Sequence, residues 1–280
     1  MQGKVVVITG GTSGIGQVAA EKLAGMGARI VLVARDKTRG EATLQRLRAL
    51  APGAAHSIHY GDLSRLPEMK RVTGEIAAAE PRIDVLMNNA GAIFNDRRVT
   101  EDGLELTFAT NHMSYFVLTH GLRDRLVASA PARVVSTSSH AHMRGRLDFD
   151  DLQMTNGYAG FKMYGRSKLL NVLFTRELSR RLAGTGVTAN SLHPGFVATR
   201  FGDQAGGAFS GWLRVLKVLA ISPEKGAETM IYLASSPEVA NTTGEYFYKC
   251  KAMQPSKAAQ DDEGAKRLWQ ETAKLAGIPE

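Results

Sequence analysis

The sequence predicts an α/β fold in which one doubly wound parallel sheet carries helices on both faces. Short β-branched runs alternate with longer segments of helical periodicity, as repeated βαβ units require. The first of these runs leads directly into a glycine-rich turn, within VVVITGGTSGIG at 5–16, where four glycines fall within seven residues. We find no repeat, low-complexity tract or linker rich in Pro, Gly or Ser, and therefore expect one domain over 1–280.

The elements follow one another in a regular order. The predicted strands are Lys4–Thr9, Arg29–Ala34, His56–Tyr60, Val85–Asn88, Ala132–Ser138, Val187–His193 and Glu245–Tyr248. Helical periodicity is clearest at Gly16–Met26, Thr38–Leu50 and Leu63–Ala79. Right-handed crossovers place such helices on both faces of the sheet, so the strands should be buried twice. The alternation breaks around 196–222, where we expect a substrate lid, and the chain should end in a helical tail.

Composition narrows the class of protein and its partners. Hydrophobic residues make up 44% of the chain, which is enough to fill a sizeable core. Lys and Arg number 35 against 27 Asp and Glu, a net charge of +8, but no basic block indicates a nucleic-acid partner. A phosphorylated cofactor is the better interpretation. The lone Cys250 excludes an intrachain disulfide and a C-x-x-C pair. Since no apolar run reaches 18 residues and no leader precedes the first strand, we expect a soluble, cytoplasmic protein.

The glycine turn indicates a dinucleotide. Gly10, Gly14 and Gly16 lie between a strand and a helix, where a bare backbone can approach a ligand closely. The unpaired N–H groups and the positive dipole end of the helix favour a pyrophosphate there. The spacing is T-G-x-x-x-G-x-G, and no G-K-[ST] follows, so this is not a P-loop. We therefore predict a Rossmann-type fold, although such a turn can also be a tight connection.

Several further motifs stand in a fixed order along the chain. They are TGGTSGIG at 9–16, GDL at 61–63, NNAG at 88–91, Asn111, STSS at 136–139, YGRSK at 164–168 and HPGFVAT at 193–199. With them the chain resembles the short-chain dehydrogenase/reductase superfamily nearly from end to end. Within that superfamily, LVARDK, APARVVSTSSHAH and SPEKGAETMIYLA resemble the retinol dehydrogenase-like branch.

The candidate catalytic residues centre on a tyrosine and a lysine. Tyr164 and Lys168 are four residues apart in a helical segment, so an ammonium should lie beside a phenol, unless both are merely exposed on one face. That cation and an oxidised nicotinamide favour phenolate, which lets Tyr164 act as general acid or base. The resemblance implies that Ser139, rather than Ser138, binds the substrate oxygen. It further implies that Lys168 holds the nicotinamide ribose and that Asn111, otherwise an ordinary helix kink or cap, anchors a relay water.

The resemblance places the cofactor contacts at the strand ends. The expected residues are Gly10, Thr12, Ser13, Gly14, Ile15, Gly16, Arg35, Asp62, Leu63, Asn89, Ala90, Gly91, Tyr164, Lys168, Pro194, Gly195, Val197 and Thr199. NNAG, with Asn88, Ala90 and Gly91, should flank the adenosine ribose. Asp62 should accept from the adenine amine, although a helix-capping Asp would look the same. The turn at 194–195 should lie over the nicotinamide. Residues 197 and 199 should contact its carboxamide.

The residues at the end of the second predicted strand indicate which nicotinamide dinucleotide binds. Ala34 stands where a carboxylate would bind the ribose 2′-hydroxyl, and Arg35 follows it. A guanidinium pairs with phosphate oxygens, so we predict NADP(H). Asp36 would oppose a phosphate if it faced inward, and Ser13 replaces the second basic residue of many NADP-preferring relatives. A plain surface position for Arg35 is the alternative.

Two other stretches carry alternatives. HAH at 140–142 could be a metal pair, but no further ligand motif accompanies it, so we favour a turn at the substrate mouth and predict no metal site. GWLRVLKVLAI at 211–221 could form a core-packed lid helix, a wall of an apolar pocket or a membrane-surface helix, in that order of preference.

Together these features predict an NADP(H)-dependent oxidoreductase that interconverts an alcohol and a carbonyl on a lipophilic aldehyde, ketone or retinoid-like substrate. A non-catalytic dinucleotide-sensing or scaffolding protein is the alternative, and the intact set of Asn111, Ser139, Tyr164 and Lys168 counts against it. The glycine spacing and the lack of a large C-terminal substrate domain disfavour a sugar-nucleotide epimerase or dehydratase. The absence of G-x-S-x-G counts against a hydrolase. A homo-oligomer and a peripheral membrane contact are left open.

Overall fold

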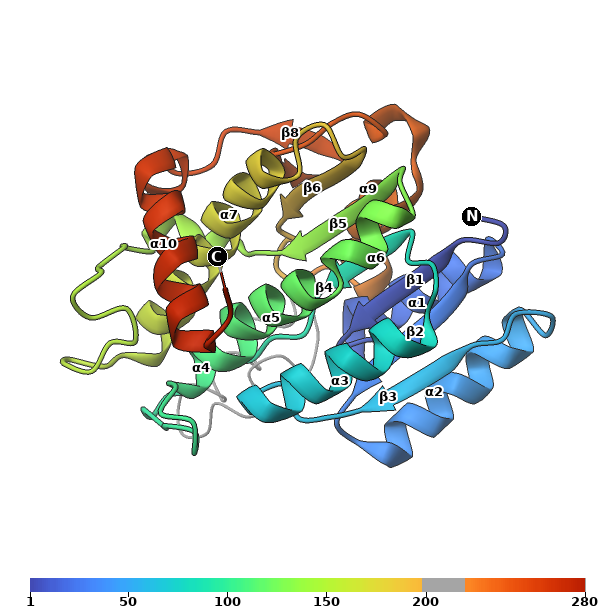
Figure 1. The fold of residues 1–280 in the computed structure, drawn as a ribbon, viewed down its shortest axis with the longest axis horizontal. Helices are drawn as coiled ribbons and strands as arrows, with labels where there is room; N and C mark the ends of the chain where they lie inside the picture. Colours follow the sequence, from blue (N-terminus) through green and yellow to red (C-terminus); the bar gives the residue numbers. More distant parts are fainter. Residues whose placement is uncertain (198–219, 280) are drawn as a thin grey trace.

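The sheet organises the molecule. The structure is a computed structural model, and it describes residues 1–197 and 220–279. Its strands are β1 (Val5–Thr9), β2 (Arg29–Ala34), β3 (Ser57–Tyr60), β4 (Val85–Asn88), β5 (Ala132–Thr137), β6 (Val187–Leu192), β7 (Tyr246–Tyr248) and β8 (Lys251–Met253). They form one eight-stranded sheet in the order β3-β2-β1-β4-β5-β6-β7-β8 (Figure 1). Strands β1 to β7 pair in parallel, which confirms the predicted Rossmann-type α/β class.

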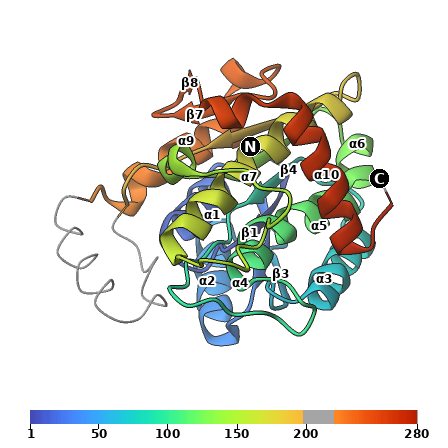
Figure 2. The same cartoon turned by 90° about the vertical axis from the view of Figure 1, so that its left-hand side faces the viewer.

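Helices cover both faces of this sheet. They are α1 (Gly14–Gly25), α2 (Lys37–Leu50), α3 (Leu66–Ala79), α4 (Leu106–Phe108), α5 (Ser114–Gly121), α6 (Arg123–Ala128), α7 (Gly160–Arg181), α9 (Pro223–Ser235) and α10 (Asp262–Ala276). Short turns are η1 (Ala109–Met113), η2 (His140–Arg144), η4 (Pro237–Val239) and η5 (Lys257–Gln260). Helix α1 packs against α2 and α9 on one face, whereas α3 packs against α5 on the other, with α10 lying on α7 (Figure 2).

Two apolar cores follow from the alternation of side chains along each strand. On β1, Val6 and Ile8 lie in the core beneath α1 and α9, whereas Val7 lies in the core beneath α3, α5 and α7. All three side chains are fully buried. A strand that is covered on both faces needs an unbroken apolar run, which is the pattern that the sequence shows.

The last strand departs from the prediction. β8 pairs antiparallel to β7, so the sheet is not wholly parallel, and no strand was predicted there. Lys249 and Cys250 join the two strands with φ angles of 51° and 60°. Two successive residues with positive φ form the tight hairpin turn that Asn-Gly usually supplies. Since Lys-Cys carries no such signal, the hairpin could not be read from the residue types.

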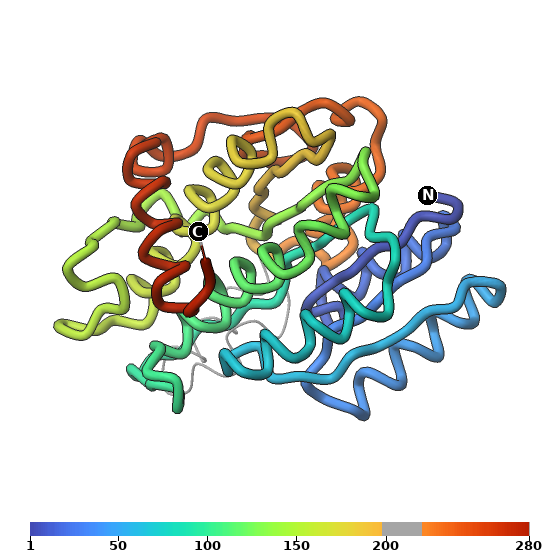
Figure 3. The backbone as a smooth tube through the Cα atoms, viewed as in Figure 1, coloured from blue at the N-terminus to red at the C-terminus, as the bar shows by residue number. Residues whose placement is uncertain are grey.

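The reversal of strand order creates the position for a ligand. β1 has β2 on one side and β4 on the other, so the chain winds outward in two directions from this pair. Figure 3 follows it from the first strands, in blue, to the C-terminal segments, in orange and red, at the opposite edge. In open α/β sheets, the crevice at the carboxyl ends of such strands binds ligands. Every site residue predicted at a strand end and described by the structure lies along this edge.

Candidate active site

The glycine turn after β1 packs backbone against backbone. Gly10 and Gly14 have φ angles of +66° and +54°, which side chains rarely adopt. A Cβ atom on Gly16 would overlap the Gly10 carbonyl and the Asn89 amide. A Cβ atom on Gly10 would lie 2.9 Å from the Cα atom of Ala90. The glycines are therefore required by the neighbouring chain segment as well as by any ligand.

Asn89 and Thr9 hold this turn in place. The Asn89 side-chain amide donates to the carbonyl oxygens of Thr9, at 3.0 Å, and Gly10, at 3.2 Å. The Thr9 hydroxyl accepts from the backbone N–H groups of Asn89 and Ala90, at 2.9 and 3.0 Å. Thr9 was not predicted as a site residue. Asn88, by contrast, points into the core, where its amide donates to the Thr119 hydroxyl at 2.9 Å.

The start of α1 can receive an anion. Ser13 precedes the helix, and within the described residues its side chain makes no capping hydrogen bond. The first turn carries no acidic residue, and half-buried Gly14 and Ile15 begin the helix beside Thr12. The first N–H groups of a helix have no partner within it, and the helix dipole is positive there. This end of α1 and the bare turn before it fit a pyrophosphate.

The ends of β2 and β3 bring Arg35 beside Asp62. The guanidinium lies 4.0 Å from the carboxylate, and the Arg35 side chain is 57% exposed. Asp36 caps α2: it accepts from the Arg39 N–H at 2.9 Å and from its guanidinium at 3.0 Å, contacts that lower the pKa of Asp36. Asp62 also accepts from the backbone N–H and the hydroxyl of Ser64. Leu63 beside it is buried, so only its backbone can face a ligand.

Ser139 and Tyr164 meet at the carboxyl end of β5. Burial raises the pKa of the Tyr164 phenol to about 12, and a hydrogen bond from the Ser139 side chain acts in the opposite direction. Ser139 is half-buried, whereas Ser138 is buried and donates to the carbonyl of Lys168 at 2.7 Å. Of the two serines, the geometry therefore favours Ser139 as the group that can reach a substrate oxygen.

Lys168 lies behind the tyrosine and is 2% exposed. Its Nζ atom donates to the Thr137 carbonyl at 3.0 Å and lies 5.7 Å from the ring centroids of both Tyr164 and Tyr115. Burial lowers the pKa of Lys168 to about 7. The neighbouring cation and an oxidised nicotinamide favour the expected phenolate, whereas burial opposes charge on both side chains. Gly91 leaves room here, since a Cβ atom on it would lie 3.3 Å from Nζ.

Asn111 fastens the loop after β4 to α7. It sits in the π-turn η1, fully buried, and its side-chain oxygen accepts from the Ala92 N–H at 2.7 Å. Its amide donates to the Ala92 carbonyl at 2.9 Å and to the Ser167 hydroxyl at 3.0 Å. Both amide hydrogens are used by these two bonds, so a water at Asn111 could be held only through one of its two oxygen atoms.

Asn171, which was not predicted, connects Asn111 with the lysine. Its buried amide donates to the Asn111 carbonyl at 2.9 Å and approaches the Thr137 carbonyl at 3.4 Å. The Thr137 carbonyl is also the acceptor for Lys168. Asn171 lies three residues after Lys168 on α7, a spacing that places both side chains on one helix face. This spacing is the signal from which it could have been found.

The turn after β6 completes the edge. Gly195 follows Pro194 with a φ of +90°, and its N–H donates to the His193 ring at 3.2 Å. Val197 pairs with Ile221 in an isolated β-bridge. Thr199 and the apolar residues 201, 209, 212, 213, 216 and 219 of the expected lid lie outside the described residues.

A match to a family profile shows which protein family this chain belongs to. The profile of short chain dehydrogenases matches residues 4–206, nearly three quarters of the chain. The chain belongs to the short chain dehydrogenase family. It is 41% identical to human retinol dehydrogenase 13, over 99% of this chain and 85% of that protein. It is 40% identical to mouse retinol dehydrogenase 12, over 99% and 87%. The predicted resemblance to the retinol dehydrogenase-like branch is thereby confirmed.

Solved structures agree with this short chain dehydrogenase fold. An uncharacterized protein from Mycobacterium Paratuberculosis is 30% identical, with a TM-score of 0.79 over 99% of this chain and 94% of that one. The RhlG/NADP active-site complex of Pseudomonas aeruginosa is 27% identical, with a TM-score of 0.71 over 88% and 94%. A short chain dehydrogenase is an oxidoreductase that binds a nicotinamide dinucleotide, and the bare turn and open helix end described above fit its pyrophosphate. Across residues 1–197 and 220–279, no helix combines the length and apolarity needed to cross a membrane.

Proposed function

We propose that this short chain dehydrogenase is an NADP(H)-dependent enzyme that interconverts an alcohol and a carbonyl on a lipophilic substrate. One observation carries the proposal: the Ser139 side chain is hydrogen-bonded to the Tyr164 phenol at the end of β5, with buried Lys168 four residues further along α7. Two hydroxyl groups side by side can bind one substrate oxygen, and the lysine supplies the charge that a proton transfer needs.

The nicotinamide dinucleotide supplies or takes up the hydride. Ser139 donates a hydrogen bond to the substrate oxygen, and Tyr164 gives that oxygen a proton in reduction or removes one in oxidation. Lys168, when protonated, stabilises the phenolate that remains. The Asn111 carbonyl has two lone pairs, of which Asn171 occupies one, so the other can hold the water through which the proton is replaced.

The preference for NADP(H) is supported by Arg35. It lies just beyond β2, is largely exposed, and its contact with Asp62 is long at 4.0 Å, so the guanidinium can turn toward a 2′-phosphate. Asp36, which would repel a phosphate, is occupied by Arg39 instead. One structural relative was solved as an NADP complex.

The lipophilic substrate class is supported by three exposed apolar side chains, of which one lies near the Tyr164 ring and two follow segments of the proposed site along the chain. Phe161 is 46% exposed, and its ring centroid lies 6.4 Å from that of Tyr164. Met143 follows Ser139 in η2 and Phe196 follows the turn at 194–195; they are 48% and 49% exposed. Exposed apolar groups beside a reactive centre favour an apolar ligand over a sugar. The names of the curated relatives point to the same class.

The test is turnover by the purified protein. Consumption of NADPH and of NADH would be followed with aldehydes of increasing chain length, retinal, a ketone, a quinone and a sugar aldehyde. We expect faster turnover with NADPH and a KM that falls with chain length, because each buried methylene contributes about 0.8 kcal/mol. Binding of NADPH with no turnover of any carbonyl would favour the sensing or scaffolding alternative. A preference for the sugar would overturn the lipophilic assignment and leave the oxidoreductase chemistry intact.

Cytoplasmic location and assembly into a homo-oligomer stay proposals from the sequence. Sedimentation of the purified protein would decide the second, and fractionation of cells that express it would decide the first.

A further inference from the structure

His142, the second histidine of the HAH motif, is fully buried three residues after Ser139. Its Nδ1 atom lies 2.8 Å from the Ser139 carbonyl oxygen, and its Nε2 atom lies 3.2 Å from the backbone nitrogen of Ser256. A backbone N–H can only donate, so Nε2 must accept. The ring is therefore neutral, carries its hydrogen on Nδ1, and donates it to the Ser139 carbonyl. The two contacts together select one tautomer.

The turn that holds Ser139 is packed directly on the helix that carries Tyr164. The Ser139 carbonyl also accepts from the His142 backbone N–H at 3.0 Å, and the Ser139 hydroxyl accepts from the Ala141 N–H at 3.2 Å. A Cβ atom on Gly165 would lie 2.9 Å from the Ala141 carbonyl. The backbone of η2 thus touches the backbone of α7 one residue after the catalytic tyrosine.

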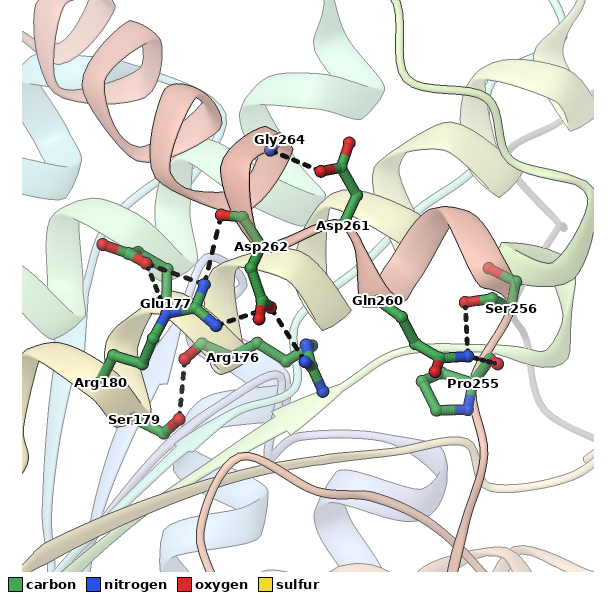
Figure 4. A network of polar contacts seen from close by, with 10 residues as sticks. All are labelled: Arg176, Glu177, Ser179, Arg180, Pro255, Ser256, Gln260, Asp261, Asp262 and Gly264. Carbon is green, nitrogen blue, oxygen red and sulfur yellow. Dashed lines mark hydrogen bonds and ion pairs between the residues drawn. The ribbon is translucent and has the colours of Figure 1, made fainter.

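The other partner of His142 is anchored to the same helix. Figure 4 shows Ser256 in the turn that leads into α10, where the Gln260 amide donates to the Pro255 carbonyl at 3.0 Å. At the start of α10, the Asp262 carboxylate accepts from Arg176 at 2.9 Å and from Arg180 at 2.7 Å, both on α7. The imidazole therefore connects the serine turn to a segment that α7 itself holds.

We infer that His142 is a positioning residue, which uses Nδ1–H and Nε2 together to fix the Ser139 peptide so that its hydroxyl meets the substrate oxygen. The inference rests on the proposed function, because that function gives Ser139 its role. A hydrogen bond to a developing charge requires its donor to lie within a few tenths of an ångström of the ideal position. A rotated Ser139 peptide therefore reduces kcat even when the fold is intact. The exposed His140 carries no such pair of contacts in the described structure.

Two substitutions separate the two ring nitrogens. In His142→Asn the amide nitrogen replaces Nδ1 and can still donate to the Ser139 carbonyl, whereas in His142→Gln the amide replaces Nε2. We expect His142→Gln to lower kcat by roughly 10-fold or more, with the Kd for NADPH unchanged, and His142→Asn to lower kcat less, because it keeps the bond to the Ser139 carbonyl and loses only the contact with Ser256. His120→Gln, at a histidine near the end of α5, is the matched control. Equal kcat losses in the Asn and Gln variants, or no loss in the Gln variant, would overturn the inference.

A second pair tests the contact with Ser256 without altering the histidine. Ser256→Pro removes the N–H donor, and the native φ of −58° suits proline. It also removes the hydroxyl that caps η5, so Ser256→Ala, which removes only that cap, is its control. We expect kcat to fall in the Pro variant relative to the Ala variant, while both variants keep the same affinity for NADPH. Identical kcat values would contradict the inference.

Nitrogen NMR of the imidazole gives a readout that does not depend on activity. The wild-type spectrum should show the hydrogen of His142 on Nδ1, and Ser256→Pro should allow the other tautomer; hydrogen on Nε2 in the wild type would overturn the inference outright. Ser139→Ala separates this outcome from a failure of the proposed function. If Ser139→Ala lowers kcat and His142→Gln does not, only the role of His142 is wrong. If no carbonyl is reduced by the wild type, the proposed function is wrong, and the NMR result still decides the tautomer.

Discussion

Burial destabilises the charged forms of both Tyr164 and Lys168. The pKa of the phenol is raised to about 12 and that of the ammonium is lowered to about 7. At neutral pH the tyrosine therefore carries its proton, as the general acid in the reduction of a carbonyl must. Each acceptor that a cofactor brings beside Nζ would raise the pKa of Lys168 and so favour the charged lysine.

Tyr164→Phe removes the proton donor and keeps the ring. We expect kcat to fall by roughly 10² or more, with the Kd for NADPH nearly unchanged, because the hydroxyl acts in the transition state. Stopped-flow turnover and fluorescence titration would measure the two quantities. Tyr232→Phe, whose hydroxyl bonds Glu238 near the end of α9, is the control. Near-normal turnover by the Tyr164→Phe variant would refute the mechanism.

Arg35→Ala should weaken NADPH much more than NADH, because only NADPH loses a charge-assisted partner. We expect roughly a 10-fold or larger rise in the Kd for NADPH and little change for NADH, measured by titration at fixed ionic strength. Arg46→Ala is a matched control, since that guanidinium on α2 pairs with Glu21 on α1. Equal losses for both cofactors would return Arg35 to a surface role.

Residue type and spacing were enough to predict part of this site and not the rest. Tyr164, Lys168 and Ser139 could be named because their spacing and their place at a strand end follow a known pattern. The pKa of Lys168 could not, since it depends on what covers the side chain. Thr9 was missed, and Asn89 was predicted only as a cofactor contact, because the bonds between them span 80 residues of chain and no local spacing reveals them.

At the scale of elements, strand bounds were predicted to within about one residue and the final hairpin was missed. The alternation of apolar runs is strong because each strand of a doubly covered sheet must be buried on both faces. The β7–β8 hairpin gives no such signal, since β8 is exposed at all three of its residues and its turn lacks Asn or Gly.

Two glycines in helices should respond in opposite ways to alanine. A Cβ atom on Gly74, inside α3, would meet no atom outside its own helix within 4 Å, so Gly74→Ala should raise the free energy of unfolding by about 0.5 to 1 kcal/mol. Gly165→Ala places a methyl group 2.9 Å from the Ala141 carbonyl and must displace η2 from α7. We expect it to lower both the Tm and kcat, as measured by thermal denaturation and turnover. A stabilised, fully active Gly165→Ala protein would show that this contact is unimportant.

At the scale of the molecule, a buried histidine links α10 to η1, the turn that also carries Asn111. His112 is fully buried in η1, and its Nε2 atom lies 3.0 Å from the Thr272 hydroxyl of α10. Its ring packs between Phe108 and Phe174. Burial lowers the pKa of His112 to about 4, so the folded protein keeps this ring neutral at physiological pH.

Stability should therefore fall as the solution becomes acidic. The unfolded chain protonates His112 below its ordinary pKa of about 6.5, whereas the folded protein resists until about 4, so stability present above 6.5 is lost as pH falls through that window. Between pH 7 and pH 5 this one residue should account for about 2 kcal/mol. Urea denaturation of the wild type and of His112→Gln at both pH values would measure it. The same pH-dependent loss in both proteins would exclude His112 as the cause.

The bond between Asn89 and Thr9 also sets an order of events during synthesis. The two residues lie 80 positions apart, and β1 needs β4 as its neighbour before the glycine turn is held. A nascent chain folds from its N-terminus, so β1 can pair early with β2 but must wait on its other side. During that interval one edge of a largely apolar strand lies open to other nascent chains. The glycine turn can thus be completed only after residue 90 has emerged, which makes the first third of this chain the stretch in which a chaperone would be of most use.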